Sequence, residues 1–238
     1  MIAFLTSSPV IGRTAVLNPA NGFLEELQKV YSHPRSVLFI CSNPDAYELT
    51  DMFVASIEKA FAQEGMLFSS LQILDRRTQN QCDSLLQKAD LIFLSGGHVP
   101  TQNRFFQEIG LAEKLKGFEG IIIGISAGSM NSAQTVYAQP ELKGEAVSES
   151  YQRFLPGLGL TKTMILPHYQ IIKYLILDGL RVLEDITFPD SMGRSIYALP
   201  DGSYLLLKDD KEELHGNAWL ISDGTIRQIN RENQTLIL

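Results

Sequence analysis

Short apolar runs alternate with longer amphipathic segments through the first two-thirds of this chain. The runs are rich in β-branched residues and do not alternate with polar ones, which is typical of strands buried on both faces of a sheet. The expected strands are residues 2–7, 36–41, 71–74, 91–94 and 121–125, and the expected helices are residues 21–32, 46–65, 81–88 and 99–116. This alternation predicts an α/β fold with a doubly wound, mostly parallel sheet and helices on both of its faces.

The pattern changes after about residue 195, where four strand-like segments follow one another without helices between them. They are residues 195–199, 203–208, 217–222 and 225–229. Turns such as Pro200-Asp201-Gly202 separate them, so we expect antiparallel hairpins that complete or edge the sheet. The chain has no linker rich in Pro, Gly or Ser and no internal repeat, and residues 1–238 are therefore predicted to form a single domain.

The composition argues against several classes of partner. The net charge is -7 without any basic block, which disfavours nucleic acid, and no apolar stretch approaches the ~20 residues that span a membrane. Cys41 and Cys82 lack the spacing of metal ligands, and the N-terminus lacks the features of a signal peptide. We therefore expect a cytoplasmic protein with two structural thiols and without a metal or cofactor. Its antiparallel edge strands are compatible with a monomer or a homodimer.

The segment Gly124-Ile125-Ser126-Ala127-Gly128 directly follows the apolar run at residues 120–123. A strand, a tight turn between small residues and a following helix form the arrangement known as a nucleophile elbow. Such a turn lifts the serine oxygen above the sheet at the N-terminus of a helix. The sequence therefore predicts Ser126 as a catalytic nucleophile.

A serine nucleophile needs a base to take its proton, and His168 is the best candidate among four histidines. It closes the strand-like run at residues 163–167, so we expect it at the same sheet edge as Ser126. His33 lies in a polar turn, and His215 is expected in an exposed turn. An imidazole can accept the serine proton during attack and return it to the leaving amine.

Two backbone amides are candidates for an oxyanion hole. The run at residues 91–94 leads into Ser95-Gly96-Gly97-His98, and paired glycines allow close approach to a substrate carbonyl. The N–H groups of Gly97 and Ala127 could hold the oxyanion of a tetrahedral intermediate. A phosphate-binding loop is disfavoured because no Gly-Lys-Ser/Thr follows.

The residues themselves do not decide which acid orients His168. Between Ser126 and His168 the chain offers Glu141, Glu145 and Glu149 and no Asp. Asp178, beyond the histidine, is a poorer candidate. One of these glutamates is expected to complete a Ser-His-Glu triad.

Three segments together resemble the aspartyl dipeptidase (peptidase E) family of serine peptidases, whose relatives include the cyanophycinases. They are Phe93-Leu94-Ser95-Gly96-Gly97, the elbow, and Pro167-His168-Tyr169. The resemblance extends over most of the first 170 residues. It implies a flavodoxin-like fold similar to class I glutamine amidotransferases, and a triad in the chain order Ser, acid, His. Alignment without a gap from Ser126 places Glu141 at the acid position, with Glu145 as the alternative.

The chain departs from this family at two places that bear on substrate. Gly96-Gly97-His98 stands where dipeptidases usually have Gly-Gly-Asn, which makes His98 a candidate to line the pocket. The stretch that carries a substrate-recognising Arg in the family is replaced by residues 170–178, and Arg181 lies at roughly the matching distance. A preference for N-terminal aspartate is thus the part of the resemblance that transfers least.

We expect a serine peptidase that hydrolyses short peptides through an acyl-enzyme, with dipeptides that begin with Asp as one candidate substrate class. An esterase or amidase using the same site is the alternative within the enzymes, because an elbow with a base does not select between esters and amides. A catalytically silent binding domain is the alternative outside them. A flavin binder is disfavoured because the turn at residues 6–12 lacks a Gly-rich phosphate cradle.

Overall fold

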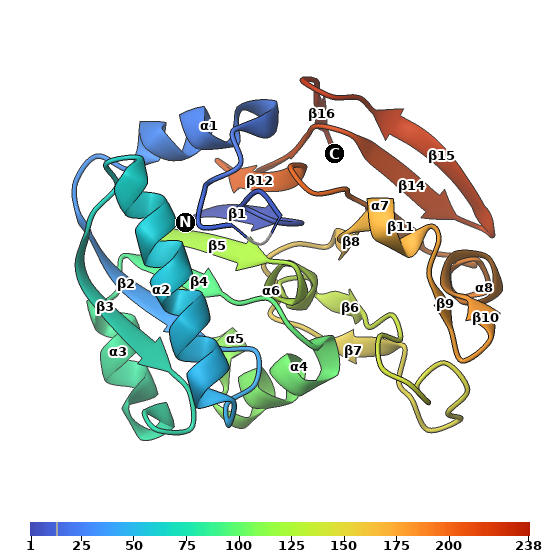
Figure 1. The fold of residues 1–238 in the computed structure, drawn as a ribbon, viewed down its shortest axis with the longest axis horizontal. Helices are drawn as coiled ribbons and strands as arrows, with labels where there is room; N and C mark the ends of the chain where they lie inside the picture. Colours follow the sequence, from blue (N-terminus) through green and yellow to red (C-terminus); the bar gives the residue numbers. More distant parts are fainter. Residues whose placement is uncertain (13) are drawn as a thin grey trace.

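The computed structural model describes residues 1–12 and 14–238, and an eight-stranded sheet forms its centre (Figure 1). The strand order is β16-β13-β12-β1-β5-β4-β2-β3. Its five parallel strands are β1 (Ile2–Thr6), β5 (Ile121–Ile125), β4 (Leu91–Leu94), β2 (Arg35–Ile40) and β3 (Phe68–Leu74). All five correspond to apolar runs in the sequence, although β3 begins three residues earlier than predicted.

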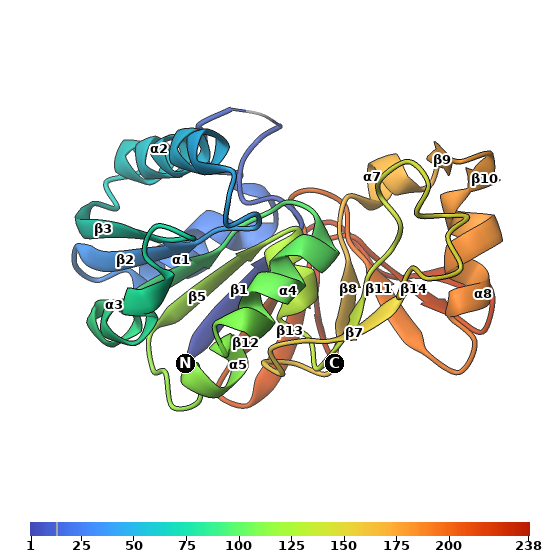
Figure 2. The same ribbon diagram turned by 90° about the horizontal axis from the view of Figure 1, so that it is seen from below.

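Helices cover both faces of this sheet, as the doubly wound prediction requires (Figure 2). α1 (Phe23–Val30) and α2 (Tyr47–Gln63) lie on one face. On the other lie α3 (Cys82–Lys88), α4 (Val99–Glu108) and α5 (Leu111–Lys114). The predicted helix at residues 99–116 is divided because Gly110 adopts a left-handed conformation with φ 64°.

Alternate side chains of the four inner parallel strands, β1, β2, β4 and β5, enter different cores, which is why these strands read as apolar runs. Leu38 and Ile40 pack toward α3 and α4, whereas Val37 and Phe39 pack toward α1 and α2. Both halves of the alternation are buried in β1, β2, β4 and β5, as predicted. β3 differs, because at the edge of the sheet it exposes Ser69, Ser70 and Gln72.

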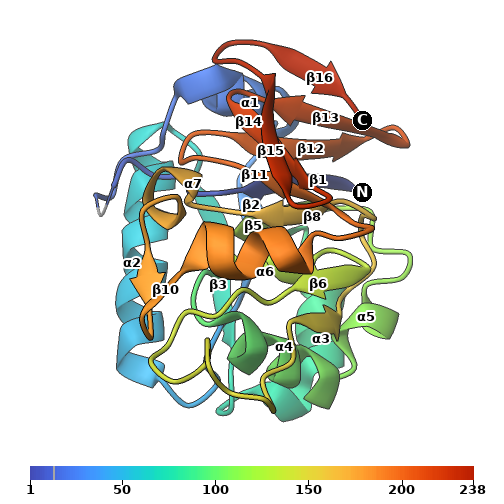
Figure 3. The same ribbon diagram turned by 90° about the vertical axis from the view of Figure 1, so that its right-hand side faces the viewer.

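The C-terminal strands belong to two sheets, and in this respect the structure corrects the sequence-based expectation (Figure 3). Three of them extend the central sheet beyond β1: β12 (Tyr204–Lys208), β13 (Lys211–His215) and β16 (Thr235–Ile237). A second sheet has the order β15 (Thr225–Asn230), β14 (Ala218–Ser222), β11 (Ser195–Ala198) and β8 (Met164–Leu166). The chain crosses from the second sheet to the central one between β11 and β12, at residues 199–203.

Several further short elements complete the fold, and the helix predicted to follow the elbow is among them. Two short antiparallel pairs are β6 (Thr135–Tyr137) with β7 (Phe154–Pro156) and β9 (Ile176–Leu177) with β10 (Leu180–Arg181). The helical segments are α6 (Ala127–Asn131), α7 (Tyr169–Ile172), a π-helical turn at Val182–Thr187 and α8 (Phe188–Asp190), with 3-10 turns at Ala20–Gly22 and Gln79–Gln81. None of the helices in the described part of the chain has the length and apolar character needed to cross a membrane.

His215 does not lie in an exposed turn, as the sequence analysis expected. It is the last residue of β13, is buried, and stacks on Tyr204 with the ring centroids 4.6 Å apart. The error arose because the polar sequence of β13 does not resemble a strand, yet it pairs with β12 along its whole length.

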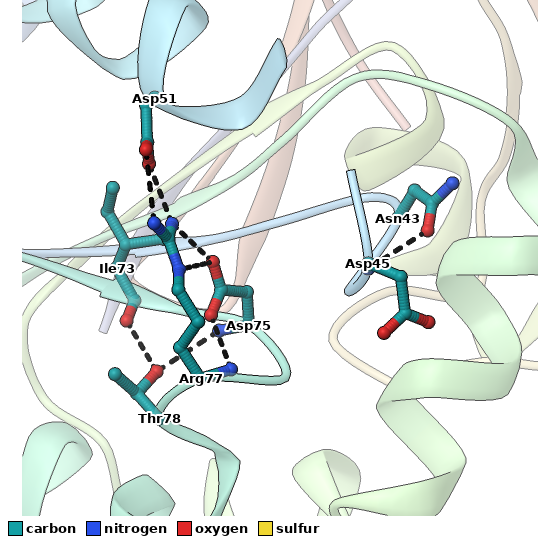
Figure 4. Close-up of polar contacts among 7 residues, drawn as sticks. All are labelled: Asn43, Asp45, Asp51, Ile73, Asp75, Arg77 and Thr78. Atoms are coloured by element: carbon teal, nitrogen blue, oxygen red, sulfur yellow. Dashed lines mark hydrogen bonds and ion pairs between the residues drawn. The ribbon is translucent and has the colours of Figure 1, made fainter. Parts of the chain in front are cut away.

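An ion-pair network that joins the buried Asp75 to two exposed side chains links the end of β3 to α2 (Figure 4). The Asp75 carboxylate accepts hydrogen bonds from the backbone N–H of Arg77 and from its guanidinium, at 2.6 to 2.9 Å. The same guanidinium donates to both oxygens of Asp51 on α2. This link fixes the position of α2, a helix that lines one side of the candidate active site.

Candidate active site

Ser126 occupies a sharp turn between β5 and α6. Its φ is 50° and its ψ -108°, a conformation that residues other than glycine rarely adopt. The turn is possible because Gly124 and Gly128 stand on either side of it. Neither of these two positions has room for a side chain. A Cβ on Gly128 would lie 2.1 Å from the carbonyl oxygen of Leu94, and one on Gly124 would lie 3.0 Å from the backbone of Ser129. The local sequence thus enforces the elbow.

His168 reaches Ser126 from a different sheet. It follows β8 of the second sheet, which corrects the expectation that both residues share one sheet edge. Its backbone has φ 56°, and its N–H donates to the Ser7 hydroxyl at 2.8 Å. Its Nε2 lies 3.0 Å from the Ser126 Oγ, within hydrogen-bonding distance. The predicted nucleophile and base are therefore brought together.

The carboxylate that contacts His168 is that of Asp201, and this corrects the predicted Glu141. Asp201 Oδ1 lies 2.7 Å from His168 Nδ1 and also accepts a hydrogen bond from the Ser7 hydroxyl at 2.7 Å. Desolvation, the largest single influence, raises the pKa of the Asp201 carboxyl group. The hydrogen bonds from His168 and Ser7 outweigh it, so the pKa lies below its usual value and the ionised form is favoured.

Sequence reasoning missed Asp201 because it lies after the histidine, in the crossover between the two sheets. The turn Pro200-Asp201-Gly202 was interpreted only as a hairpin connection. An Asp in a turn is ordinarily explained by turn formation, so the sequence offered no separate signal for this contact.

Glu141 lies near His168 without a hydrogen bond to it. The two residues line the same hollow, and no hydrogen bond or ion pair joins the Glu141 carboxyl group to another described residue. Desolvation raises the pKa of this group to about 7, and repulsion from Glu145 adds to the effect, while attraction to His168 opposes it. The residue as a whole keeps an exposed surface.

The other acidic candidates hold the loop that carries Glu141. Glu145 Oε2 accepts the backbone N–H groups of Glu141 and Leu142, each at 2.9 Å, and its Oε1 lies 2.9 Å from His98 Nε2. His98, expected to line the pocket, instead ties this loop to the start of α4.

The two remaining acidic candidates also lie away from the histidine. Asp178 accepts backbone N–H groups at residues 144 and 146. Glu149 is exposed and contacts neither Ser126 nor His168.

Gly97 and Ala127 are both placed beside the nucleophile. A Cβ on the neighbouring Gly96 would lie 3.5 Å from the Ser126 Cβ, so this glycine segment packs directly on the elbow. A Cβ on Gly97 would lie 2.3 Å from the Ser42 Oγ. Ala127 is the first residue of α6, where backbone N–H groups have no partner within the helix. These positions are compatible with the predicted oxyanion hole.

Two hollows meet at Ser126. The serine-rich hollow, of about 540 Å³, is lined by Ser7, Ser8, Ser42, Asn43, Ala46, Leu49, Thr50, Phe53, Ser95, Gly96, Gly97, Ile125, Ser126 and His168. The Glu141 hollow, of about 380 Å³, is lined by Gly97, Ser126, Met130, Gln139, Pro140, Glu141, Leu166, Pro167, His168, Ile171, Ile172 and Leu175. Gly97, Ser126 and His168 are common to both, so a bound chain could extend to either side of the nucleophile.

Arg181 lines neither hollow. It is exposed and forms an ion pair with Asp185, four residues further along the chain. Within the described ranges, no cluster of three or more His, Cys, Asp or Glu side chains is arranged to hold a metal ion.

Residues 3–215 match the family model of peptidase family S51. A crystal structure of a protein provisionally assigned as peptidase E, from Listeria monocytogenes EGD-e, superimposes with a TM-score of 0.61. The alignment covers 96% of this chain and 98% of that one at 17% sequence identity, which supports a shared fold. No match was found among curated proteins.

Proposed function

Because the chain belongs to peptidase family S51 and is a serine-type peptidase, we propose that Ser126, His168 and Asp201 form its catalytic triad and hydrolyse short peptides. One observation carries the proposal: a continuous chain of hydrogen-bonding distances from Ser126 Oγ through both ring nitrogens of His168 to Asp201. This is the arrangement by which a neutral imidazole activates a serine and a carboxylate stabilises the resulting imidazolium.

The reaction proceeds in two halves. His168 Nε2 takes the proton of Ser126 as the oxygen attacks the carbonyl carbon of the scissile peptide bond. The N–H groups of Gly97 and Ala127 stabilise the oxyanion, and His168 then protonates the leaving amine, which leaves an acyl-enzyme on Ser126. A water molecule, deprotonated by His168, attacks the acyl carbon and releases the second product.

Short peptides are favoured as substrates because the two hollows that flank Ser126 have the size of small-ligand sites. No lysine or arginine is found among the described residues that line them, and Arg181 is engaged by Asp185. A carboxylate side chain would therefore meet no cation from these residues, and the proposal does not include a preference for N-terminal aspartate.

A fluorophosphonate probe followed by intact mass spectrometry and peptide mapping tests the nucleophile. We expect one adduct, on Ser126, and its loss in Ser126→Ala together with hydrolysis of a dipeptide library. Ser148→Ala is the matched control, because its hydroxyl is exposed and its hydrogen-bond partner among the described residues is the hydroxyl of Ser150. Full peptidase activity in Ser126→Ala would falsify the mechanism.

Two other results would redirect the proposal. Hydrolysis of a chromogenic ester far faster than any peptide would favour an esterase. Failure of well-folded protein to label or to turn over any peptide would favour a catalytically silent binding domain.

A further inference from the structure

The Glu141 hollow has apolar walls and a single uncommitted charged group besides the proposed base. Met130, Leu166, Ile172 and Leu175 contribute aliphatic surface, together with the two prolines and Ile171. The side-chain amide of Gln139 donates to the Thr187 hydroxyl at 2.8 Å and is thereby engaged. The Glu141 carboxylate is left as the group able to bind a charged ligand.

The backbone of Glu141 is held in place while its side chain is free. Its N–H donates to Glu145 Oε2, and Glu145 is in turn bonded to His98 at the start of α4. His98 directly follows Gly97, so the loop that carries Glu141 is tied to the segment beside the nucleophile. The loop is thereby fixed beside the nucleophile, while the carboxylate remains available to a partner that comes from outside the chain.

An ionised carboxylate among aliphatic walls is costly unless a cation compensates it. A lysine or arginine side chain would both compensate the charge and fill the apolar hollow. Its aliphatic stem packs on the apolar surface while its cationic end pairs with the Glu141 carboxylate. The serine-rich hollow is different, since His168 is the one ionisable residue among the described residues that line it. Among the described residues, the negative charge that could pair with a cationic substrate group therefore lies in the Glu141 hollow, on one side of Ser126.

We propose that Glu141 is a specificity residue that binds the cationic side chain of a lysine or arginine adjacent to the scissile bond. The inference rests on the proposed peptidase function of Ser126. It assigns different roles to two acids: Asp201 orients His168, whereas Glu141 contacts the substrate.

Matched peptides test the assignment. Lys and norleucine differ by the charged end of the side chain, and Arg and citrulline differ by the charge of an otherwise similar group. Each is placed on either side of the scissile bond in peptides with free or acetylated N-termini. We expect kcat/KM for Lys over norleucine to be about tenfold to a hundredfold, the effect of one charge-assisted hydrogen bond. In Glu141→Gln this ratio should fall by at least about tenfold.

Glu149→Gln is the matched control, because Glu149 lies in the same loop and lines neither hollow. It should leave the ratio unchanged. Affinities of the same peptides for Ser126→Ala protein, with and without Glu141→Gln, provide a readout that does not depend on turnover, and they should show the same preference.

Three outcomes would overturn the proposal. The first is an absence of preference for the charged member of either pair. The second is an equal loss of kcat on all peptides in Glu141→Gln, which would mark Glu141 as a residue that orients His168. The third is a preference that follows the free N-terminus and not the side chain. Labelling of Ser126 by the fluorophosphonate separates these outcomes from failure of the proposed function.

Discussion

Two carboxyl groups lie near His168, and their surroundings shift their pKa values in opposite directions. Asp201, on the side of the second sheet, accepts hydrogen bonds from His168 and Ser7, and its pKa is lowered despite desolvation. Glu141, on the loop that precedes β7 (Phe154–Pro156), has no such donor among the described residues, and desolvation raises its pKa to about 7.

We infer from this difference that the hydrogen-bond donors around a carboxylate bear on its role more than its distance along the chain from the base does. An acid that is hydrogen-bonded in its ionised form can orient an imidazole and remain charged throughout a reaction. An acid without donors is available to a ligand, and when desolvation raises its pKa to about 7, as for Glu141, its charge changes near neutral pH.

The largest expected effect comes from Asp201→Asn. Without the carboxylate, His168 is no longer held in the tautomer that accepts the Ser126 proton, and kcat should fall by roughly 10³ to 10⁴. Steady-state kinetics on an uncharged peptide measure the loss, with Glu141→Gln as the comparison. A greater loss of kcat in Glu141→Gln than in Asp201→Asn would reverse the roles of the two acids.

A substitution at a third acid, Asp75, distinguishes a loss of stability from a loss of catalysis. Asp75 is buried at the end of β3 and pairs with Arg77, away from His168. Asp75→Asn removes a charged acceptor and should lower the free energy of unfolding by roughly 2 kcal/mol, the contribution of a hydrogen bond to a charged group. Thermal and urea denaturation measure this change. The kcat per folded molecule should stay within about threefold of wild type, and a loss like that of Asp201→Asn would contradict the separation.

The pH dependence of substrate preference sharpens the contrast further. With a pKa of about 7, Glu141 is mostly protonated at pH 6 and mostly ionised at pH 8. The ratio of kcat/KM for Lys over norleucine peptides should therefore rise by up to about tenfold between these pH values, and any pH effect common to both peptides cancels from the ratio. His168, Glu145 and Tyr151 are the titratable groups that interact with Glu141. A ratio that is constant with pH would contradict the prediction.

Glu145→Gln gives the smallest predicted effect. The amide oxygen can still accept the backbone N–H groups of the loop, but the repulsion that helps to raise the Glu141 pKa is removed. The midpoint of the Lys-over-norleucine ratio should move to lower pH by less than about one unit and stay above the usual value for glutamate, because desolvation remains. A shift to higher pH would show that Glu145 acts on Glu141 in another way.

Much of the fold could be predicted because its signals are local. Four of the five parallel strands, β1, β2, β4 and β5, are recognisable as apolar runs, since both of their faces are buried. The edge strand β3 contains exposed polar residues, and its first three residues were not predicted. The second sheet could not be separated from the first, because β11 and β12 have similar short patterns and their partners lie far away in the sequence. β13 was missed because its polar residues conceal a strand whose pairing is tertiary.

The sequence by itself determined the elbow at Ser126, because Gly124 and Gly128 are the residues that so crowded a turn requires and they stand next to it. It also indicated His168, through a distinctive short motif after a strand. Only the tertiary structure decided which carboxylate contacts the histidine. Asp201 reaches Nδ1 because the chain crosses there from one sheet to the other. A contact made by such a crossover depends on the packing of two sheets, and no spacing along the chain encodes it.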